Sequence, residues 1–442
     1  EELEGRFRLS APLPALEQAG RDTRLRELLG SLSGLESQVD KLERVAGWER
    51  GQLTRQTVDQ LYGRRVAMSA SRMDKYKSCH FSYFMRYGLR AEPRKPAGFT
   101  APEYGTFVHY VLEHVLQDDM FRQTRLPGME PEKLDEDTRG RLRQLTRQAV
   151  DRYVAEELGG LEGQSDRFRY LFHRLLRSVQ AVVDNVAEEL LHSSFRPISF
   201  ELGFGKGEDL PPVELTVDGV TISVSGFVDR VDGWVHDGRL YLRVVDYKTG
   251  TKVFQLSDVL FGLNMQDAFV PHHRLAKTEK GPVWGTWFPR GILYMPSQDA
   301  PVETDRHADE AAVKKEKGKQ FKMNGLLLDD KQVIVGMEPG AAGLFIPAKL
   351  TKSGELDSRS SVASLSQFGR LAAQMEELLT RMAQTLLEGD VAAVPAAGEY
   401  DACAWCDYKT VCGHERRDPV RFVEKIDRVQ VLEALADKEV QP

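Results

Sequence analysis

The dipeptide Asp237–Gly238 lies between two strand-like runs, and this arrangement constrains the fold more than any other local feature. The runs, VTISVSGFVDRV (220–231) and RLYLRVVDYK (239–248), are rich in β-branched and aromatic residues, as β-strands are. Asp-Gly is a strong signal for a two-residue hairpin turn. A turn of this kind would set His236 opposite Arg239. A second Asp-Gly pair, at 218–219, predicts another hairpin just upstream.

The predicted hairpin register places Asp229 opposite Asp246. Like charges directly across a ladder are destabilising, so the pair calls for a compensating cation. Because side chains alternate along a strand, Lys248 shares a face with Asp246. Two carboxylates beside an ammonium group suit Mg²⁺ or Mn²⁺ phosphodiester chemistry, in which the metal activates water and the lysine orients or deprotonates it. The alternative is that Asp246 only begins a turn before Thr249 and Gly250.

Other side chains are candidates for the same site. His109 lies on a predicted amphipathic helix, 104–116, and its imidazole suits a metal position that carboxylates leave open; the alternative is a core histidine. Glu113, on the same helix face, and Glu201 are weaker candidates, because such glutamates usually just meet water. Gln266, in a helix predicted after the strand, is a candidate for orienting the phosphate or the water, and a surface glutamine is the alternative.

The chain has four cysteines, three of them in the segment CAWCDYKTVC: Cys403, Cys406 and Cys412, with Cys79 far upstream. Such sparse use does not suit a secreted disulfide scaffold and predicts a reducing, cytoplasmic setting. Four thiolates suit either tetrahedral zinc or an iron–sulfur cluster. Zinc usually takes more symmetric cysteine pairs, so a compact trio with one distant cysteine favours a [4Fe-4S] cluster that ties the start of this region to its end.

The remaining patterns predict a mixed α/β chain. The expected helices lie at 69–89, with Ser71 as a cap, at 168–191, and at 364–389, with a capping box from Ser364 to Gln367 and a stop at Gly389. The further expected strands are 198–205, 213–217 and 291–296. Residues 305–324 form a charged segment that we expect to be exposed. The chain has no GxxxxGK[ST] phosphate loop, so we do not expect this stretch to hydrolyse ATP by itself.

Length and composition exclude several classes of protein. A chain of 442 residues predicts two or three lobes, and 41% hydrophobic with 29% charged residues is ordinary for a globular protein. No apolar run approaches the roughly 20 residues of a membrane span. The net charge of −7 argues mildly against a general polyanion binder, although a local basic channel is compatible with it. The chain begins with Glu and without a signal-peptide core, so we expect a fragment or a processed chain.

Together, these motifs resemble a known family. GTFVH, GFVDRVD, VVDYKTG and CAWCDYKTVC occur in the order found in the RecB-like branch of the PD-(D/E)XK nucleases, in its iron–sulfur form. Outside the active site, LYGRRVAMSASRMDKYKSCHF, FKMNGLLLDD and SSVASLSQFGRLAAQMEELL are similar to the C-terminal part of the AddB family, the B-type components of AddAB helicase–nucleases. These landmarks run from residue 61 to residue 414.

The resemblance implies a restriction-endonuclease-like α/β fold, with a mixed sheet flanked by helices. It implies catalysis by Lys248 and metal ligation by His109, Asp229 and Asp246, with the Tyr247 carbonyl as an additional ligand. It also implies that the four cysteines bind the cluster. The family often has a tyrosine four residues after the glutamine of the next motif, and here Val270 follows Gln266.

The same resemblance implies a Mg²⁺- or Mn²⁺-dependent DNA exonuclease. It would degrade the 5′-ended strand during double-strand break resection for recombinational repair, and it would act on single-stranded DNA and duplex ends. Its partner would be an AddA-type helicase–nuclease subunit, which would carry the ATP motor.

These features predict three parts: residues 1–66, a helical segment or linker from an upstream helicase-like body; residues 67–420, the nuclease domain closed by the cluster; and residues 421–442, a C-terminal tail. Two other functions fit parts of the pattern. The first is a stand-alone Cas4- or Dna2-like iron–sulfur nuclease, against which FKMNGLLLDD and the long middle insertion argue. The second is a non-catalytic scaffold that binds DNA ends, which the intact Asp229, Asp246 and Lys248 argue against.

Overall fold

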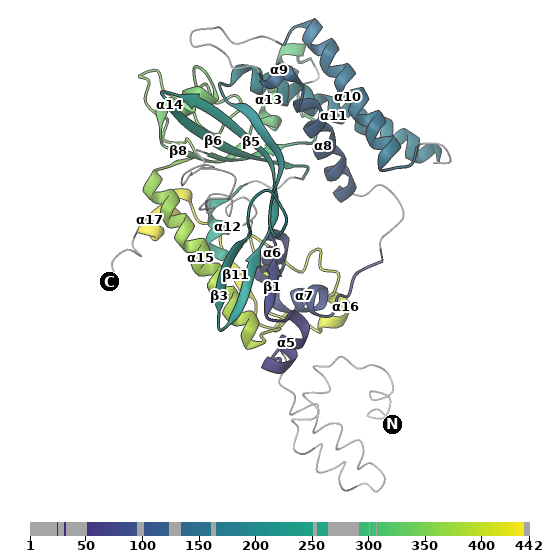
Figure 1. Cartoon of the computed structure of the whole chain (residues 1–442), viewed down its shortest axis with the longest axis vertical. Coiled ribbons are helices and arrows are strands. Elements are labelled where there is room, and N and C mark those ends of the chain that lie inside the picture. Colours follow the sequence, from purple (N-terminus) through teal and green to yellow (C-terminus); the bar gives the residue numbers. More distant parts are fainter. Residues whose placement is uncertain are drawn as a thin grey trace.

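The computed structural model describes residues 24, 31, 51–94, 101–122, 134–160, 165–250, 254–263, 291–299, 301–305 and 307–436. Two lobes follow one another along the long axis of the molecule (Figure 1). One lobe holds a large sheet with helices packed beside it, and the other holds a small sheet with long and short helices around it. There are two large hydrophobic cores, as expected for a chain of this length. One lies between the large sheet and its helices, and the other surrounds the small sheet and also includes Ile292, Leu326 and Leu328 of the large sheet.

The large sheet has six strands in the order β2-β5-β6-β7-β8-β9. Their bounds are β2 Arg196–Phe204, β5 Gly226–His236, β6 Arg239–Lys248, β7 Gly291–Pro296, β8 Asn324–Leu328 and β9 Val362–Ala363. Strands β2, β5 and β6 are antiparallel, β6 and β7 are parallel, β7 and β8 are antiparallel, and β8 and β9 are parallel. The prediction of an α/β fold with a mixed sheet flanked by helices is therefore confirmed.

Helices pack against one face of this sheet and extend beyond it (Figure 1). They are α8 Ala101–Leu116, α9 Asp119–Arg122, α10 Glu136–Glu156, α11 Asp166–His192, α13 Glu310–Phe321 and α14 Lys331–Met337. Their apolar side chains meet those of the sheet in one core, which includes Phe107 and Val111 of α8, Val182 and Val186 of α11, and Val245 of β6. This packing holds α8 against α10, α11 and the edge strand β2.

The second lobe is built on a three-stranded sheet in the order β1-β4-β3, from Arg65–Met68, Val220–Val224 and Val213–Val217. Around it lie α5 Arg55–Tyr62, α6 Ala70–Ser78, α7 His80–Tyr83, a π-helical turn Phe84–Gly88, α12 Leu256–Phe261, α15 Leu365–Glu388 and α16 Lys409–Cys412. The residues after 420 form β11 Arg421–Val423, which pairs with β10 Ala396–Gly398, and α17 Arg428–Ala436, which packs on α15. Thus part of the predicted tail contributes to this lobe.

The chain passes between the two sheets at Ser225. The run 220–231, predicted as a single strand, is two strands: β4 belongs to the small sheet and β5 to the large one. The single-strand prediction was therefore wrong. The sequence does not reveal the break, because strand-forming residues continue on both sides of it. Strand β4 buries alternate residues, whereas β5 buries the continuous stretch 228–233.

Both predicted hairpins are present. Asp218 and Gly219 have φ of 49° and 74°, and Asp237 and Gly238 have φ of 48° and 70°, which is the left-handed pair of conformations that a type I′ turn requires. The second turn sets His236 opposite Arg239, and the same register continues to Arg230 opposite Val245. The predicted hairpin register is confirmed.

Two predicted helix caps have different outcomes. The capping box between Ser364 and Gln367 is present, and Gly389 ends α15 with a φ of 87°. At α6, Ser69 and not Ser71 is the N-cap, and its side chain accepts a hydrogen bond from the Arg72 amide. The charged segment 305–324 contains the helix α13, where the sequence predicted only exposed chain.

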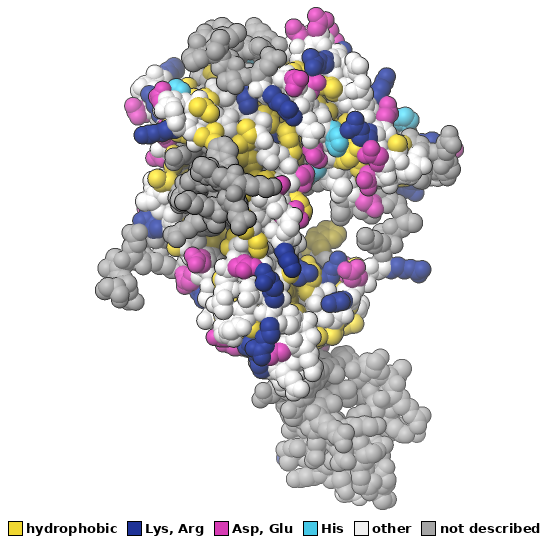
Figure 2. Space-filling model, viewed as in Figure 1, with side chains coloured by type: hydrophobic (Ala, Val, Ile, Leu, Met, Phe, Trp, Pro, Cys, Tyr) yellow, Lys and Arg dark blue, Asp and Glu magenta, His cyan; other side chains and the backbone are white. Residues whose placement is uncertain are grey.

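Within the part of the chain that the structure describes, no helix is long and apolar enough to cross a bilayer. On the face that Figure 2 shows, Lys and Arg side chains are interspersed with Asp and Glu side chains over both lobes. The net charge of −7 is therefore not concentrated in one acidic field on this face.

Candidate active site

Three carboxylates lie on one face of the large sheet, in adjacent strands. The register of β2 with β5 places Glu201 beside Asp229. Asp229 and Asp246 follow directly after the last pair of β5 with β6, Arg230 with Val245, and their charges act on each other. Asp229 and Asp246 are 6% and 3% exposed. We call these three residues the carboxylate row. Two carboxylates as deeply buried as Asp229 and Asp246 rarely lie so close together without a cation.

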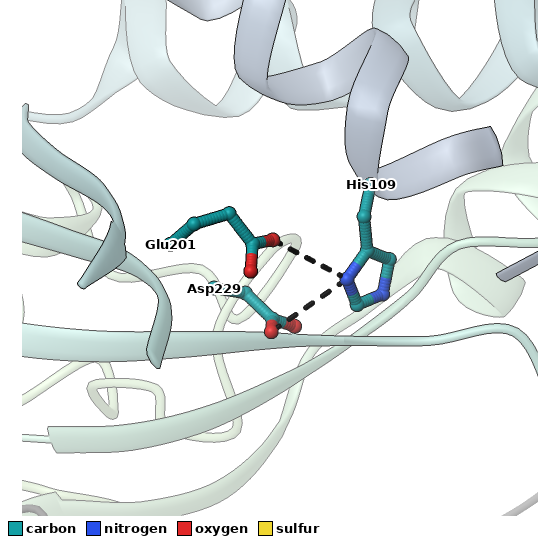
Figure 3. Close-up of side chains that lie close together, drawn as sticks. All are labelled: His109, Glu201 and Asp229. Carbon is teal, nitrogen blue, oxygen red and sulfur yellow. Dashed lines mark ion pairs between the residues drawn. The ribbon is translucent and has the colours of Figure 1, made fainter. Parts of the chain in front are cut away.

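His109 projects from α8 toward Glu201 and Asp229 (Figure 3). Its Nδ1 atom lies 3.7 Å from Glu201 Oε1 and 3.6 Å from Asp229 Oδ1. Its Nε2 atom lies 3.1 Å from the carbonyl oxygen of Tyr247. Because a carbonyl can only accept, Nε2 carries a hydrogen, and this bond turns Nδ1 toward the carboxylates.

The electrostatics of this group correspond to a site that attracts a cation. Burial by itself would lower the pKa of His109, but Glu201, Asp229 and the Tyr247 carbonyl outweigh it and raise the pKa to about 9. Burial, reinforced by the Asp246 carboxylate, raises the pKa of Asp229 to about 7, although His109 acts in the opposite direction. A proton on His109 therefore supplies positive charge between the carboxylates.

The residues present also fit a divalent metal ion. One ligand atom each from His109, Glu201 and Asp229 can be chosen so that all lie within 4.8 Å of one another. Among the described residues, no other set of three His, Cys, Asp or Glu side chains meets this condition, so Asp246 lies beside this closest group and not within it. A nitrogen and several carboxylate oxygens form a donor set that accepts Mg²⁺ or Mn²⁺.

The end of β6 brings Lys248 and Tyr247 to the same place. The Lys248 ammonium forms an ion pair with Asp246 Oδ2 and lies 5.0 Å from the centre of the Tyr294 ring. The Tyr247 amide donates a hydrogen bond to Asp229 Oδ2 at 2.6 Å. Since side chains alternate along the strand, Lys248 shares the face of Asp246, whereas the Tyr247 side chain lies on the opposite face.

Glu201 is the residue that the sequence pattern undervalued. Its φ is 43°, a left-handed conformation that costs a non-glycine residue about 1–3 kcal/mol and is concentrated at functional sites. It is a weak candidate from the sequence because such glutamates usually just meet water. Its position beside Asp229 depends on the pairing of β2 with β5, which no short turn sets. The sequence signal that could have identified Glu201 is its carboxylate within the strand-like run 198–205.

Of the other candidates, Glu113 does not join this group. Glu113 lies one turn beyond His109 on α8, and its carboxylate accepts a hydrogen bond from Gln117 at 3.4 Å. Gln266 lies outside the described residues. Its predicted role therefore stays a prediction.

The structure brings the cysteine-rich loop to the helix that Cys79 begins. Cys79 precedes α7, and Cys406 Sγ lies 4.0 Å from Ser82 Oγ of that helix. Burial raises the pKa of the Cys79 thiol, and the nearby Cys406 and Cys403 act in the same direction. Cys412 ends α16 in the same loop. Cys79 is thus near Cys403 and Cys406, and Cys403 is near Cys412, but among the described residues no three of the cysteine sulfur atoms lie within 4.8 Å of one another.

The chain matches a family model described as the PD-(D/E)XK nuclease superfamily over residues 67–413. This match includes His109, the carboxylate row, Lys248 and all four cysteines. It covers well over half of the 442 residues.

The chain is also similar to curated proteins that are named as the B component of an ATP-dependent helicase/deoxyribonuclease. The protein from Clostridium novyi is 32% identical over 372 residues, which are 81% of this chain and 31% of that protein. Those from Clostridium acetobutylicum and Ruminiclostridium cellulolyticum are each 33% identical, over 80% of this chain and 30% of theirs. The chain thus spans less than a third of the length of these relatives. On the match over residues 67–413, the chain belongs to the PD-(D/E)XK nuclease superfamily.

Proposed function

We propose that this chain is a metal-dependent deoxyribonuclease module of an AddAB-type helicase–nuclease, with its active site at His109, Glu201, Asp229, Asp246 and Lys248. The observation that carries the proposal is the geometry of the carboxylate row, with an imidazole on one side and an ammonium group on the other. The name of the relatives, which combines helicase and deoxyribonuclease, supports the same class.

Each residue has a chemical role in this proposal. His109 Nδ1, Glu201, Asp229 and Asp246 hold the metal, and the Tyr247 carbonyl fixes the orientation of the imidazole. When bound there, a divalent ion polarises a phosphate oxygen and lowers the pKa of bound water. Lys248, held by Asp246, orients the attacking water and stabilises negative charge that develops on the phosphate.

The proposal extends to strand choice and partner. The degraded strand is the 5′-ended one, in the resection of double-strand breaks for recombinational repair, and the partner is an AddA-type subunit that supplies the ATP-driven motor. The support is the naming of the relatives as one component of an ATP-dependent helicase/deoxyribonuclease.

A pair of variants in one hairpin tests the nuclease proposal. Asp246→Asn removes a proposed metal ligand, whereas Asp237→Asn changes an exposed carboxylate in the turn of the same hairpin and keeps a residue type that the turn accepts. Mg²⁺-dependent degradation of single-stranded DNA should fall to background in Asp246→Asn and persist in Asp237→Asn. Undiminished cleavage by Asp246→Asn would show that the active site lies elsewhere.

The strand choice is tested in the complex with the partner protein. Duplex DNA labelled on either strand at one end is unwound with ATP and Mg²⁺. Asp246→Asn should protect the 5′-ended strand and leave degradation of the 3′-ended strand unchanged. Protection of the 3′-ended strand would reverse the proposed polarity without affecting the proposed active site.

We also propose that Cys79, Cys403, Cys406 and Cys412 hold a [4Fe-4S] cluster. The support is the pattern of the compact trio Cys403, Cys406 and Cys412 with the distant Cys79, which favours a cluster over a zinc ion held by symmetric cysteine pairs. The cluster would act as a structural staple.

A buried cation supports a negatively charged centre at these cysteines. The Nε and Nη2 atoms of Arg421 are buried without a hydrogen-bond partner in the part of the chain that the structure describes. Burial lowers the pKa of Arg421, and the nearby Cys79 opposes that shift. Four thiolates around a metal centre would supply the negative charge that this guanidinium needs. Anaerobically purified protein should be brown and contain about four irons per chain; a colourless protein with one zinc ion would contradict the cluster.

A further inference from the structure

Four buried charged side chains lie on the opposite face of the sheet from the carboxylate row. They are Glu189 of α11, Arg230 and Asp232 of β5, and Arg243 of β6, and each is at most 1% exposed. Arg243 donates hydrogen bonds to Glu189 at 2.6 Å and to Asp232 at 2.8 Å. Arg230 donates to Glu189 at 3.3 Å, and its Nε atom lies 2.9 Å from Asp232 Oδ1. We call this set the buried charge network.

Stability alone is a weak reason for such a network. Each buried charge loses its hydration, and buried ion pairs are often no more stabilising than well-packed hydrophobic residues of similar volume. The network has two positive and two negative groups, so it is neutral as a whole. What it adds is fixed geometry, because each guanidinium is held by two carboxylates in defined directions.

The network contacts the active site through Tyr247. Arg230 donates a hydrogen bond to the Tyr247 hydroxyl at 3.3 Å, and its guanidinium lies 5.7 Å from the centre of the tyrosine ring. The backbone of Tyr247 faces the metal ligands, with its amide on Asp229 and its carbonyl on His109. Arg230 itself is the residue after Asp229. A shift of Arg230 would therefore move both the Asp229 carboxylate and the strand that orients His109.

We propose that Glu189 is a positioning residue for the metal site: through Arg230 and Tyr247 it fixes the spacing between the strands that carry Asp229 and Asp246. Glu189 is the member of the network that comes from a helix, so it ties the register of β5 and β6 to α11. This role rests on the proposed metal-dependent nuclease and extends it to a residue that touches neither metal nor DNA.

The test separates metal affinity from turnover. Glu189→Gln keeps the shape of the side chain and removes its charge, and Glu188→Gln, at the neighbouring position of the same helix, is the control. For Glu189→Gln, the Mg²⁺ concentration for half-maximal cleavage should rise about tenfold or more, while the rate at saturating Mg²⁺ stays within about twofold of the unmodified protein. Glu188→Gln should change neither quantity.

A purely structural role predicts a different pattern. If Glu189→Gln lowered the free energy of unfolding but left the metal dependence of folded protein unchanged, the proposal would be wrong. Because a single buried change leaves the two arginines short of negative charge, Glu189→Gln with Arg243→Gln serves as a charge-balanced second variant, for which the same rise is expected.

Direct metal binding keeps this test distinct from the proposed nuclease. The affinity for Mn²⁺ is measured by paramagnetic resonance in the same variants, without DNA. Weaker Mn²⁺ binding by Glu189→Gln supports the positioning role even if the unmodified protein cleaves no DNA. Normal Mn²⁺ binding by Glu189→Gln and by the double variant Glu189→Gln with Arg243→Gln overturns the positioning role even if the nuclease proposal holds.

Discussion

The protonation of His109 gives the candidate site a measurable property at the scale of single residues. In the metal-free protein, its pKa of about 9 and that of Asp229, about 7, mean that protons occupy positions that a metal ion needs. A metal ion binds imidazole in its neutral form and carboxylate in its ionised form, so metal and protons compete.

The affinity for Mn²⁺ should therefore rise with pH. Below the pKa of His109, the loss of one competing proton improves apparent affinity by about tenfold per pH unit. Below the pKa of Asp229 the dependence should become steeper, because a second proton competes. Calorimetric titrations from about pH 6 to about pH 9 measure this, and an affinity independent of pH over that range would mean that His109 and Asp229 do not bind the metal.

Glu201 supplies a second prediction at this scale. Glu201→Gln should weaken Mn²⁺ binding by about tenfold or more, since it removes one charged oxygen from the donor set. The matched control is Glu113→Gln, because Glu113 lies one turn from His109 but outside the group of ligand atoms that converge. Equal Mn²⁺ affinities in the two variants would remove Glu201 from the site.

The sequence predicted some residues of this site and not others, for physical reasons. Asp229 and Asp246 could be paired in advance because a two-residue turn sets the register of the strands around it. Glu201 could not, because its neighbour Asp229 lies across a pairing set by tertiary packing. The relation of Lys248 to Asp246 followed from strand alternation, whereas the bond between His109 and Tyr247 depends on how α8 packs on the sheet.

At the scale of elements, the hairpin β5–β6 positions the site. It carries two residues of the carboxylate row, Lys248, and three members of the buried charge network. Strands β3, β6 and β7 begin and end where the sequence predicted, because turn-forming residues lie next to their ends. The split at Ser225 and the helix α13 could not be predicted, because the former depends on how the two sheets are placed and the latter has no clear apolar face.

A side chain added at Gly238, in the turn of this hairpin, should lower the stability of the fold. Gly238 has a φ of 70°, and an L-residue there costs about 1–2 kcal/mol. Gly238→Ala should lower the free energy of unfolding by that amount. Gly140, inside α10, has open space at the position of a Cβ atom, so Gly140→Ala should raise it by about 0.5–1 kcal/mol. Denaturant unfolding measures both, and changes of the same sign would contradict the turn geometry.

At the scale of the whole molecule, the second lobe joins distant parts of the chain. Gln52 bridges to Asp390, the Phe81 amide donates to the Ala392 carbonyl, and the Tyr408 hydroxyl donates to the Ala91 carbonyl. The cysteine loop lies at this junction. A metal centre there would stabilise the folded lobe, because it closes a long loop only in the native state.

Loss of the proposed cluster should therefore destabilise this lobe. Cys79→Ser should lower the thermal midpoint by about 4 °C or more, which corresponds to roughly 2 kcal/mol in a domain of this size. The same substitution should have little effect on protein already stripped of metal. A similar decrease in both forms would assign the effect to packing around Cys79 and not to a metal centre.

The central claim is that His109 and the carboxylate row bind a divalent metal ion, and anomalous diffraction from crystals containing Mn²⁺ tests it most directly. We expect a strong anomalous peak within about 2–2.5 Å of His109 Nδ1 and of carboxylate oxygens from the row, and its loss in Asp229→Asn crystals. A fully occupied Mn²⁺ peak elsewhere, with none between His109 and Asp229, would contradict the claim.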